Sequence, residues 1–201
     1  MNNKTLGTLA LAGAPFLGLG MTVEQLYQPL HDSWFTGAWG LIYISAWLCS
    51  IIALRRLEAT GRSRFGKAIL WVITGTLVIA NVSNGYQLLF PGEKTAMYYA
   101  LDAFWPLSNL VMAGVGIAVI AARGLPGWRR YVPLAAGLWF PFTVLCMALL
   151  GSWEAAKPAS SLYTAVAWTV LAVVVLTTPA PRPPEARTAY SSLRVPPTRQ
   201  E

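Results

Sequence analysis

The sequence predicts an all-α integral membrane protein, a six-transmembrane-helix bundle with both termini in the cytoplasm. Three observations support this fold class. First, 55% of the 201 residues are hydrophobic and only 11% are charged, whereas soluble domains have about 25% charged residues. Second, six stretches are apolar enough and long enough to cross a membrane, which takes about 20 residues. Third, the basic residues gather between alternate stretches.

The first three predicted spans are residues 6–23, 35–54 and 68–90, and none contains Lys or Arg. The first span also resembles a signal peptide, because a lysine precedes LGTLALAGA and small residues stand at Ala12 and Ala14. The apolar run continues through PFLGLGM beyond that cleavage point, which favours a retained helix. Cleavage would leave five spans in the same orientation.

The last three predicted spans are residues 102–122, 132–150 and 162–178, and Asp102 is the only acid in them. Residues 1–178 thus form one predicted membrane domain. Residues 179–201 contain six prolines and four arginines, and such a stretch buries too little apolar surface to fold alone. We expect a disordered, solvated cytoplasmic tail, with binding of anionic headgroups or of a proline-recognition module as alternatives.

The basic residues predict the orientation, because short loops rich in Lys and Arg stay in the cytoplasm. With the N-terminus inside, thirteen of the fifteen Lys and Arg residues are cytoplasmic and only Lys94 and Lys157 lie outside. Glu24, Asp32, Glu93 and Glu154 fall in the predicted outer loops. The net charge of +7 therefore reflects insertion into the cell membrane, and nucleic acid is not a predicted partner.

The inventory of reactive side chains argues against most membrane enzymes and cofactors. His31 is the single histidine, whereas bis-histidine haem and HExxH zinc sites need at least two. Cys49 and Cys146 lie inside spans and form no CxxC motif. His31 beside Asp32 is the only pair of a base and an orienting acid, and no GxSxG supplies a nucleophile. No cofactor or metal is predicted, and an enzyme is the weaker class.

A polar stripe in the third span is one candidate site. At 100° per residue, Thr74, Asn81 and Asn84 share one side of the outer half of this helix. Asparagine amides in a membrane are suited to helix–helix adhesion at about 1 kcal/mol per bond. Contact with a polar ligand is the alternative.

The start of the fourth span is a second candidate. Asp102, Trp105, Asn109 and Met112 share a face through steps of 3, 4 and 3. Asp102 is expected at the outer boundary, where a helix N-cap is one interpretation. In the other interpretation, this face and the two asparagines line a cavity open to the outer side.

Aromatic residues add to both interpretations. Tyr86 belongs to a group of Trp, Tyr and Phe residues near the outer boundary, which is typical of an interfacial belt or of an aromatic-lined pocket. Phe35, Trp39, Tyr43 and Trp47 follow one another at steps of four in the second span. This ridge packs between helices, faces lipid, or grips a flat apolar ligand.

These features lead to three functional hypotheses. The first is a non-enzymatic protein that binds a small apolar or amphipathic molecule, or a lipid, in an outer-facing cavity. The second is an accessory subunit of a membrane complex or a homo-oligomer, in which the Trp39–Trp47 ridge contacts partner helices. The third is an enzyme acting on lipids, which would need His31 and Asp102 to approach one another. The candidate ligand-binding residues are Asn81, Asn84, Asp102, Trp105, Asn109, Tyr86, Trp39 and Tyr43.

Overall fold

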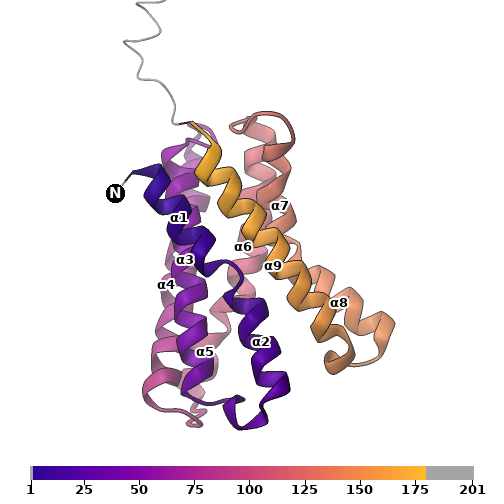
Figure 1. Cartoon of the computed structure of the whole chain (residues 1–201). Coiled ribbons are helices and arrows are strands. Elements are labelled where there is room, and N and C mark those ends of the chain that lie inside the picture. Colours follow the sequence, from indigo (N-terminus) through magenta and orange to yellow (C-terminus); the bar gives the residue numbers. More distant parts are fainter. Residues whose placement is uncertain (1, 180–201) are drawn as a thin grey trace, which may run out of the picture.

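The computed structural model describes residues 2–179, and within them every regular element is a helix (Figure 1). Five helices or joined helix pairs are long and apolar enough to cross a membrane, and α7 with α8 adds a sixth if this bent pair counts as one span. The chain is therefore a multi-pass helical membrane protein. The tail predicted from residue 179 lies, apart from Pro179, outside the described residues.

The helices follow the order that the hydropathy pattern predicts. Their bounds are α1 Asn3–Gly13, α2 Phe16–Leu26, α3 Trp34–Arg56, α4 Arg64–Leu89, α5 Ala96–Asp102, α6 Phe104–Ala122, α7 Val132–Gly137, α8 Trp139–Leu150 and α9 Trp153–Thr177. Two short 3-10 turns, η1 Gln28–Leu30 and η2 Gly127–Tyr131, precede α3 and α7.

Hydroxyl side chains cap the starts of four helices. The hydroxyls of Ser33, Ser63, Thr95 and Ser152 each accept a hydrogen bond from a backbone N–H in the first turn of α3, α4, α5 and α9. Such caps satisfy donors that have no acceptor within the helix. Helix α9 consequently starts directly after Ser152, nine residues before the start predicted for the sixth span.

Prolines mark breaks in three spans. Pro15 separates α1 from α2, and Pro106 and Pro141 lie in the first turns of α6 and α8. Proline is tolerated there because first-turn N–H groups lack intrahelical acceptors. The largest bend, 56°, lies between α7 and α8. Near this break the hydroxyl of Tyr163 donates to the carbonyl of Ala135 at 2.6 Å.

Close helix contacts depend on glycine. A Cβ added to Gly37 would lie 2.4 Å from the backbone nitrogen of Leu88, so α3 and α4 touch backbone to backbone. Gly116 brings α6 equally close to Leu134 of α7. Helices α3, α4, α6 and α9 surround a buried core that includes Trp47, Ile51, Leu54, Ile73, Leu77, Met112, Val115, Val119, Leu171 and Val175.

The two ends of the bundle differ in charge. We call one end the basic end, because Arg55, Arg56, Arg62, Arg64, Lys67, Arg123, Arg129 and Arg130 lie there. The opposite, acidic end has the side chains Glu24, Asp32, Glu93, Asp102 and Glu154, with His31, Lys94 and Lys157. That the basic end faces the cytoplasm remains a prediction.

Three charged residues differ from their predicted places in loops. Glu24 belongs to α2, and Glu154 and Lys157 belong to the first turns of α9. Charged residues normally end a membrane span, which is why the sequence pattern places them outside. Here Glu24 and Lys157 are each only 6% exposed, so both side chains are covered by the protein and neither marks the end of its helix.

Candidate functional site

The acidic half of the bundle has an unusually polar interior. We call six of its buried side chains, from four helices, the polar interior: Glu24 of α2, Ser83 and Gln87 of α4, Asn109 of α6, and Lys157 and Thr164 of α9. At a rise of 1.5 Å per residue, each lies within about 17 Å of the acidic end of its helix. Buried polar groups are costly in hydrocarbon surroundings, so their concentration marks this region as a candidate site.

The carboxylate of Glu24 is held by two donors from α3. Its Oε1 accepts from the hydroxyl of Thr36 at 2.5 Å and from the indole Nε1 of Trp39 at 2.9 Å. The Trp39 ring lies so close to Gly20 that an added Cβ would be 2.4 Å from it. The backbone of α2 therefore fixes the indole, and the indole orients the carboxylate.

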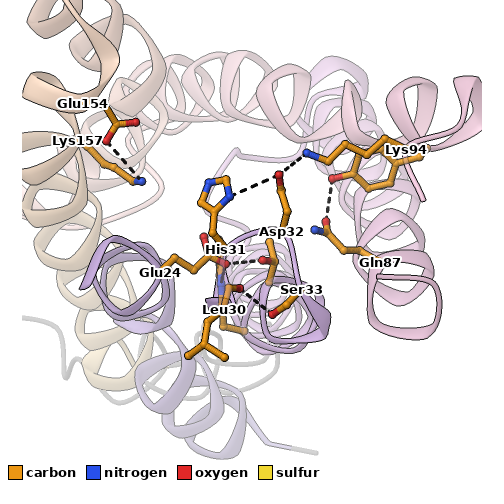
Figure 2. Close-up of polar contacts among 12 residues, drawn as sticks. Glu24, Leu30, His31, Asp32, Ser33, Gln87, Lys94, Glu154 and Lys157 are labelled. Atoms are coloured by element: carbon orange, nitrogen blue, oxygen red, sulfur yellow. Dashed lines mark hydrogen bonds and ion pairs between the residues drawn. The ribbon is translucent and has the colours of Figure 1, made fainter. Parts of the chain in front are cut away.

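Lys157 is a buried ammonium with a distant counter-charge. Its nearest carboxylate oxygen is Oε2 of Glu154 at 4.0 Å, and the Glu154 side chain is 70% exposed. Figure 2 shows the Lys157 side chain running from α9 toward His31. A charged group removed from water interacts strongly with any polar partner that reaches it.

Several atoms of the polar interior lack a hydrogen-bond partner among the described residues. They are the hydroxyl oxygens of Ser83 and Thr164, the amide Nε2 of Gln87 and the amide Oδ1 of Asn109. Gln87 does accept from the hydroxyl of Tyr98 at 2.8 Å, and Asn109 donates to the carbonyl of Trp105 at 3.1 Å. Each unsatisfied buried group costs about 1 to 3 kcal/mol.

Buried aromatic side chains lie further along α3 and α9, toward the middle of the bundle. The rings of Trp47 and Trp168 are 4.1 Å apart, and Tyr43 meets Trp168 edge-on at 6.0 Å. Both indole Nε1 groups are buried without a partner in the described chain. Trp105 packs against Trp139 at 4.9 Å, between the starts of α6 and α8.

At the acidic surface, two loops are joined by an ion pair. Asp32, in the turn between α2 and α3, binds Nζ of Lys94 through Oδ2 at 2.6 Å, and the same oxygen lies 3.5 Å from Nδ1 of His31 (Figure 2). Asp32 adopts a left-handed backbone with φ of 54°, which aspartate tolerates better than most residues. The contact joins the α2–α3 turn to the α4–α5 turn.

The two predicted asparagines lie elsewhere, between α3 and α4. Asn81 donates to the hydroxyl of Ser45 at 3.2 Å, and Asn84 donates to Asn81 at 3.5 Å. The Asn84 amide also packs against Gly40, where an added Cβ would lie 2.4 Å from its Oδ1. These contacts match the adhesion interpretation.

The predicted face of the fourth span is divided by a helix break. Asp102 is the last residue of α5, and α6 begins after Ala103 without a side-chain cap, so the N-cap interpretation of Asp102 is wrong. The break arises because Pro106, in the first turn of α6, cannot donate to the preceding turn. Asn109 and Met112 are fully buried, whereas Asp102 is half-buried.

The predicted aromatic residues are largely internal. Tyr43 is 2% and Trp47 is 1% exposed, so this part of the ridge packs inside the chain and is not available to partner helices. Trp39 binds Glu24. Tyr86 packs against Phe90 and Tyr98, with ring centroids 5.2 and 6.2 Å away.

Five of the six members of the polar interior, all except Asn109, were missed by sequence reasoning, although the helical spacing of some of them was informative. Glu24 continues the buried face of Leu17 and Met21, and Lys157 precedes Ser161 and Thr164 at steps of four and three. No protein-family model matches the chain, and no match is found among curated proteins or solved structures. The functional assignment therefore depends on the geometry of this region.

Proposed function

We propose that this membrane protein binds a small amphipathic molecule, whose polar end occupies the polar interior at the acidic end. The observation that supports the proposal is the group of unpartnered atoms on Ser83, Gln87, Asn109 and Thr164. A fold gains nothing in stability from four such groups, and apolar residues of similar shape would be cheaper. A bound polar molecule that hydrogen-bonds to them explains why they are there.

The charges favour a polar end that contains both signs. Glu24 is a fixed acceptor for a donor or an ammonium group, and Lys157 is a donor for an acidic group. Both are nearly buried, where electrostatic contacts are stronger than in water. The tryptophan and tyrosine rings further along α3 and α9 suit the apolar part of the same molecule.

Native mass spectrometry of the protein, released gently from its own membranes, tests this proposal. The wild type should retain a small-molecule adduct. Asn109→Leu and Lys157→Met should each lose it, because they remove an acceptor and the buried ammonium. Asn81→Leu and Lys4→Met are the matched controls, since Asn81 is satisfied at the α3–α4 contact and Lys4 is exposed.

Two outcomes would contradict the proposal. One is an adduct that survives both polar-interior variants. The other is a co-purifying polypeptide with no small molecule, which would favour the accessory-subunit hypothesis. A partner helix could then contact the exposed apolar groove of about 480 Å³ between α7, α8 and α9, where Phe142 stacks on Tyr163 at 4.4 Å.

A further inference from the structure

The basic end contains a pocket that the acidic-end site does not involve. Its volume is about 490 Å³, and its lining includes Arg55, Glu58, Arg62, Lys67 and Trp71. Three cationic side chains thus surround the pocket with one carboxylate. This excess of positive charge suits an anion.

Two of the three basic side chains, Arg55 and Arg62, are held by neighbouring side chains. The guanidinium of Arg55 lies 3.9 Å above the ring centre of Trp71. Stacking uses the face of a guanidinium and leaves its N–H groups directed outward in the plane, where they can donate to phosphate oxygens. Arg62 donates through Nε to Oε2 of Glu58 at 2.8 Å, which fixes one side of its guanidinium group. Lys67 lies one turn into α4 and is exposed.

The loop that forms the pocket is anchored. The hydroxyl of Thr60 donates to the carbonyl of Gly66 at 2.7 Å, and Ala59 is fully buried. A Cβ added to Gly124 would lie 2.0 Å from the carbonyl oxygen of Ala59, so the two loops at this end touch. Gly61 has φ of +74° and completes the turn. The pocket is therefore part of a packed structure.

An apolar groove continues from this pocket. It has a volume of about 610 Å³, runs between the start of α4 and the end of α6, and shares Thr60, Gly61 and Arg62 with the basic pocket. Phe65 and Ile117 line it and are 66% and 61% exposed. The groove reaches Gly114, about 12 Å from the basic end of α6 at 1.5 Å per residue. This depth lies at the level of acyl chains.

We infer that the basic pocket and the adjoining groove bind one anionic phospholipid from the leaflet at the basic end. The phosphate and the anionic headgroup contact Arg55, Arg62 and Lys67, and one acyl chain lies in the groove along Phe65, Ile117 and Ala121. A basic pocket alone would accept any soluble phosphate. The continuous apolar groove at membrane depth selects a lipid, since only a lipid fills both parts.

The test uses the full-length protein in nanodiscs with equal amounts of phosphatidylglycerol and phosphatidylcholine, followed by native mass spectrometry. The wild type should retain phosphatidylglycerol in preference. Replacing Arg55, Arg62 and Lys67 together by Gln should reduce that retention at least about tenfold. A control with the same loss of charge, Lys4→Gln, Arg64→Gln and Arg123→Gln, should retain it, because these exposed residues line neither part of the site.

Ala121→Phe tests the groove separately. Ala121 is exposed and lines the groove, so the larger side chain should block the acyl chain without disturbing the core. Loss of phosphatidylglycerol in this variant supports the lipid assignment.

Equal losses in the basic-pocket and control triple variants would show a general surface attraction and overturn the site. If Ala121→Phe retains phosphatidylglycerol unchanged and also binds glycerol 3-phosphate, the basic pocket recognises the phosphate ester without an acyl chain in the groove. That result would identify a soluble phosphate ester as the ligand and overturn the lipid assignment. Arg62→Gln with Lys67→Gln, both exposed, serves if the triple variant does not fold.

Discussion

The two ends of the bundle use their polar residues in opposite ways. At the basic end most charged side chains lie at the surface, as Arg62 and Lys67 do, although Nε of Arg130 is buried without a partner in the described chain. At the acidic end Glu24, Lys157 and the amides of α4 and α6 point into the protein, and several of their atoms have no partner in the described chain. The first arrangement is what the predicted orientation in a membrane requires, and it suits contact with lipid headgroups. The second is costly for stability, and the proposed binding of a polar molecule would offset that cost.

The largest expected difference between the two ends is in their accessibility to reagents outside the cell. In a variant that lacks Cys49 and Cys146, a cysteine at Glu93 should react with an impermeant thiol reagent in intact cells, and one at Arg62 should not. Both positions are exposed, and the charge distribution predicts that only the basic end is cytoplasmic. Ready labelling at position 62 would reverse the orientation.

The acidic end should also depend strongly on close helix contact. Gly37→Leu forces a side chain into the backbone of α4 and should destabilise the protein by about 3 kcal/mol. Gly85→Leu is the control, since a Cβ there has no neighbour within 4 Å. Thermal unfolding in detergent measures both, and similar melting temperatures would show that α3 and α4 are not in such contact.

Removing a buried charge should cost more at the acidic end than removing an exposed charge at the basic end. Glu24→Leu leaves the Thr36 hydroxyl and the Trp39 indole without their acceptor, at an expected cost of about 2 kcal/mol. Arg62→Gln should leave the melting temperature unchanged, because its side chain is 72% exposed. Thermal unfolding in detergent measures both variants, and equal melting temperatures would contradict the role given to Glu24.

The smallest expected effects are those of two asparagine substitutions, which should change the stability of the protein in opposite directions. In ligand-free protein, Asn81→Leu breaks the bond to Ser45 and should cost about 0.6 kcal/mol. Asn109→Leu removes an unsatisfied buried oxygen and should raise stability by about 1 kcal/mol. Denaturant unfolding after removal of any adduct measures both. Destabilisation by Asn109→Leu as large as by Asn81→Leu would mean that Asn109 is structural.

Hydropathy is sufficient to predict five of the six spans, because about 20 apolar residues have few other uses, whereas the fifth predicted span is a bent helix pair. The second span, predicted as 35–54, appears as α3 Trp34–Arg56. The ends of the spans are harder to predict at charged residues, since a charged residue marks the end of a membrane span only where it meets water. Lys157 does not, because Ser152 caps α9 and the rest of the protein covers the side chain.

The site was harder to predict than the fold. Asn81 and Asn84 stand out in a linear sequence as strongly as Gln87 and Asn109 do, and only tertiary contacts distinguish them. Asn81 finds a partner in Ser45 across the α3–α4 contact and Asn84 donates to Asn81 on the same helix, whereas Gln87 and Asn109 each keep an unpaired atom. Helix periodicity gives the face that a residue occupies, but it does not give the helix that lies opposite.

The bend between α7 and α8 has a consequence for the surrounding bilayer. Helix α8 has twelve residues and therefore a length of about 18 Å. Inclined by 56° to α7, it adds only about 10 Å along the α7 axis, and the α8–α9 turn stops short of the other turns at this end (Figure 1). The apolar length here is well below the hydrocarbon thickness of about 30 Å. This hydrophobic mismatch should thin the acidic-end leaflet beside α8, so lipids with shorter chains should gather there.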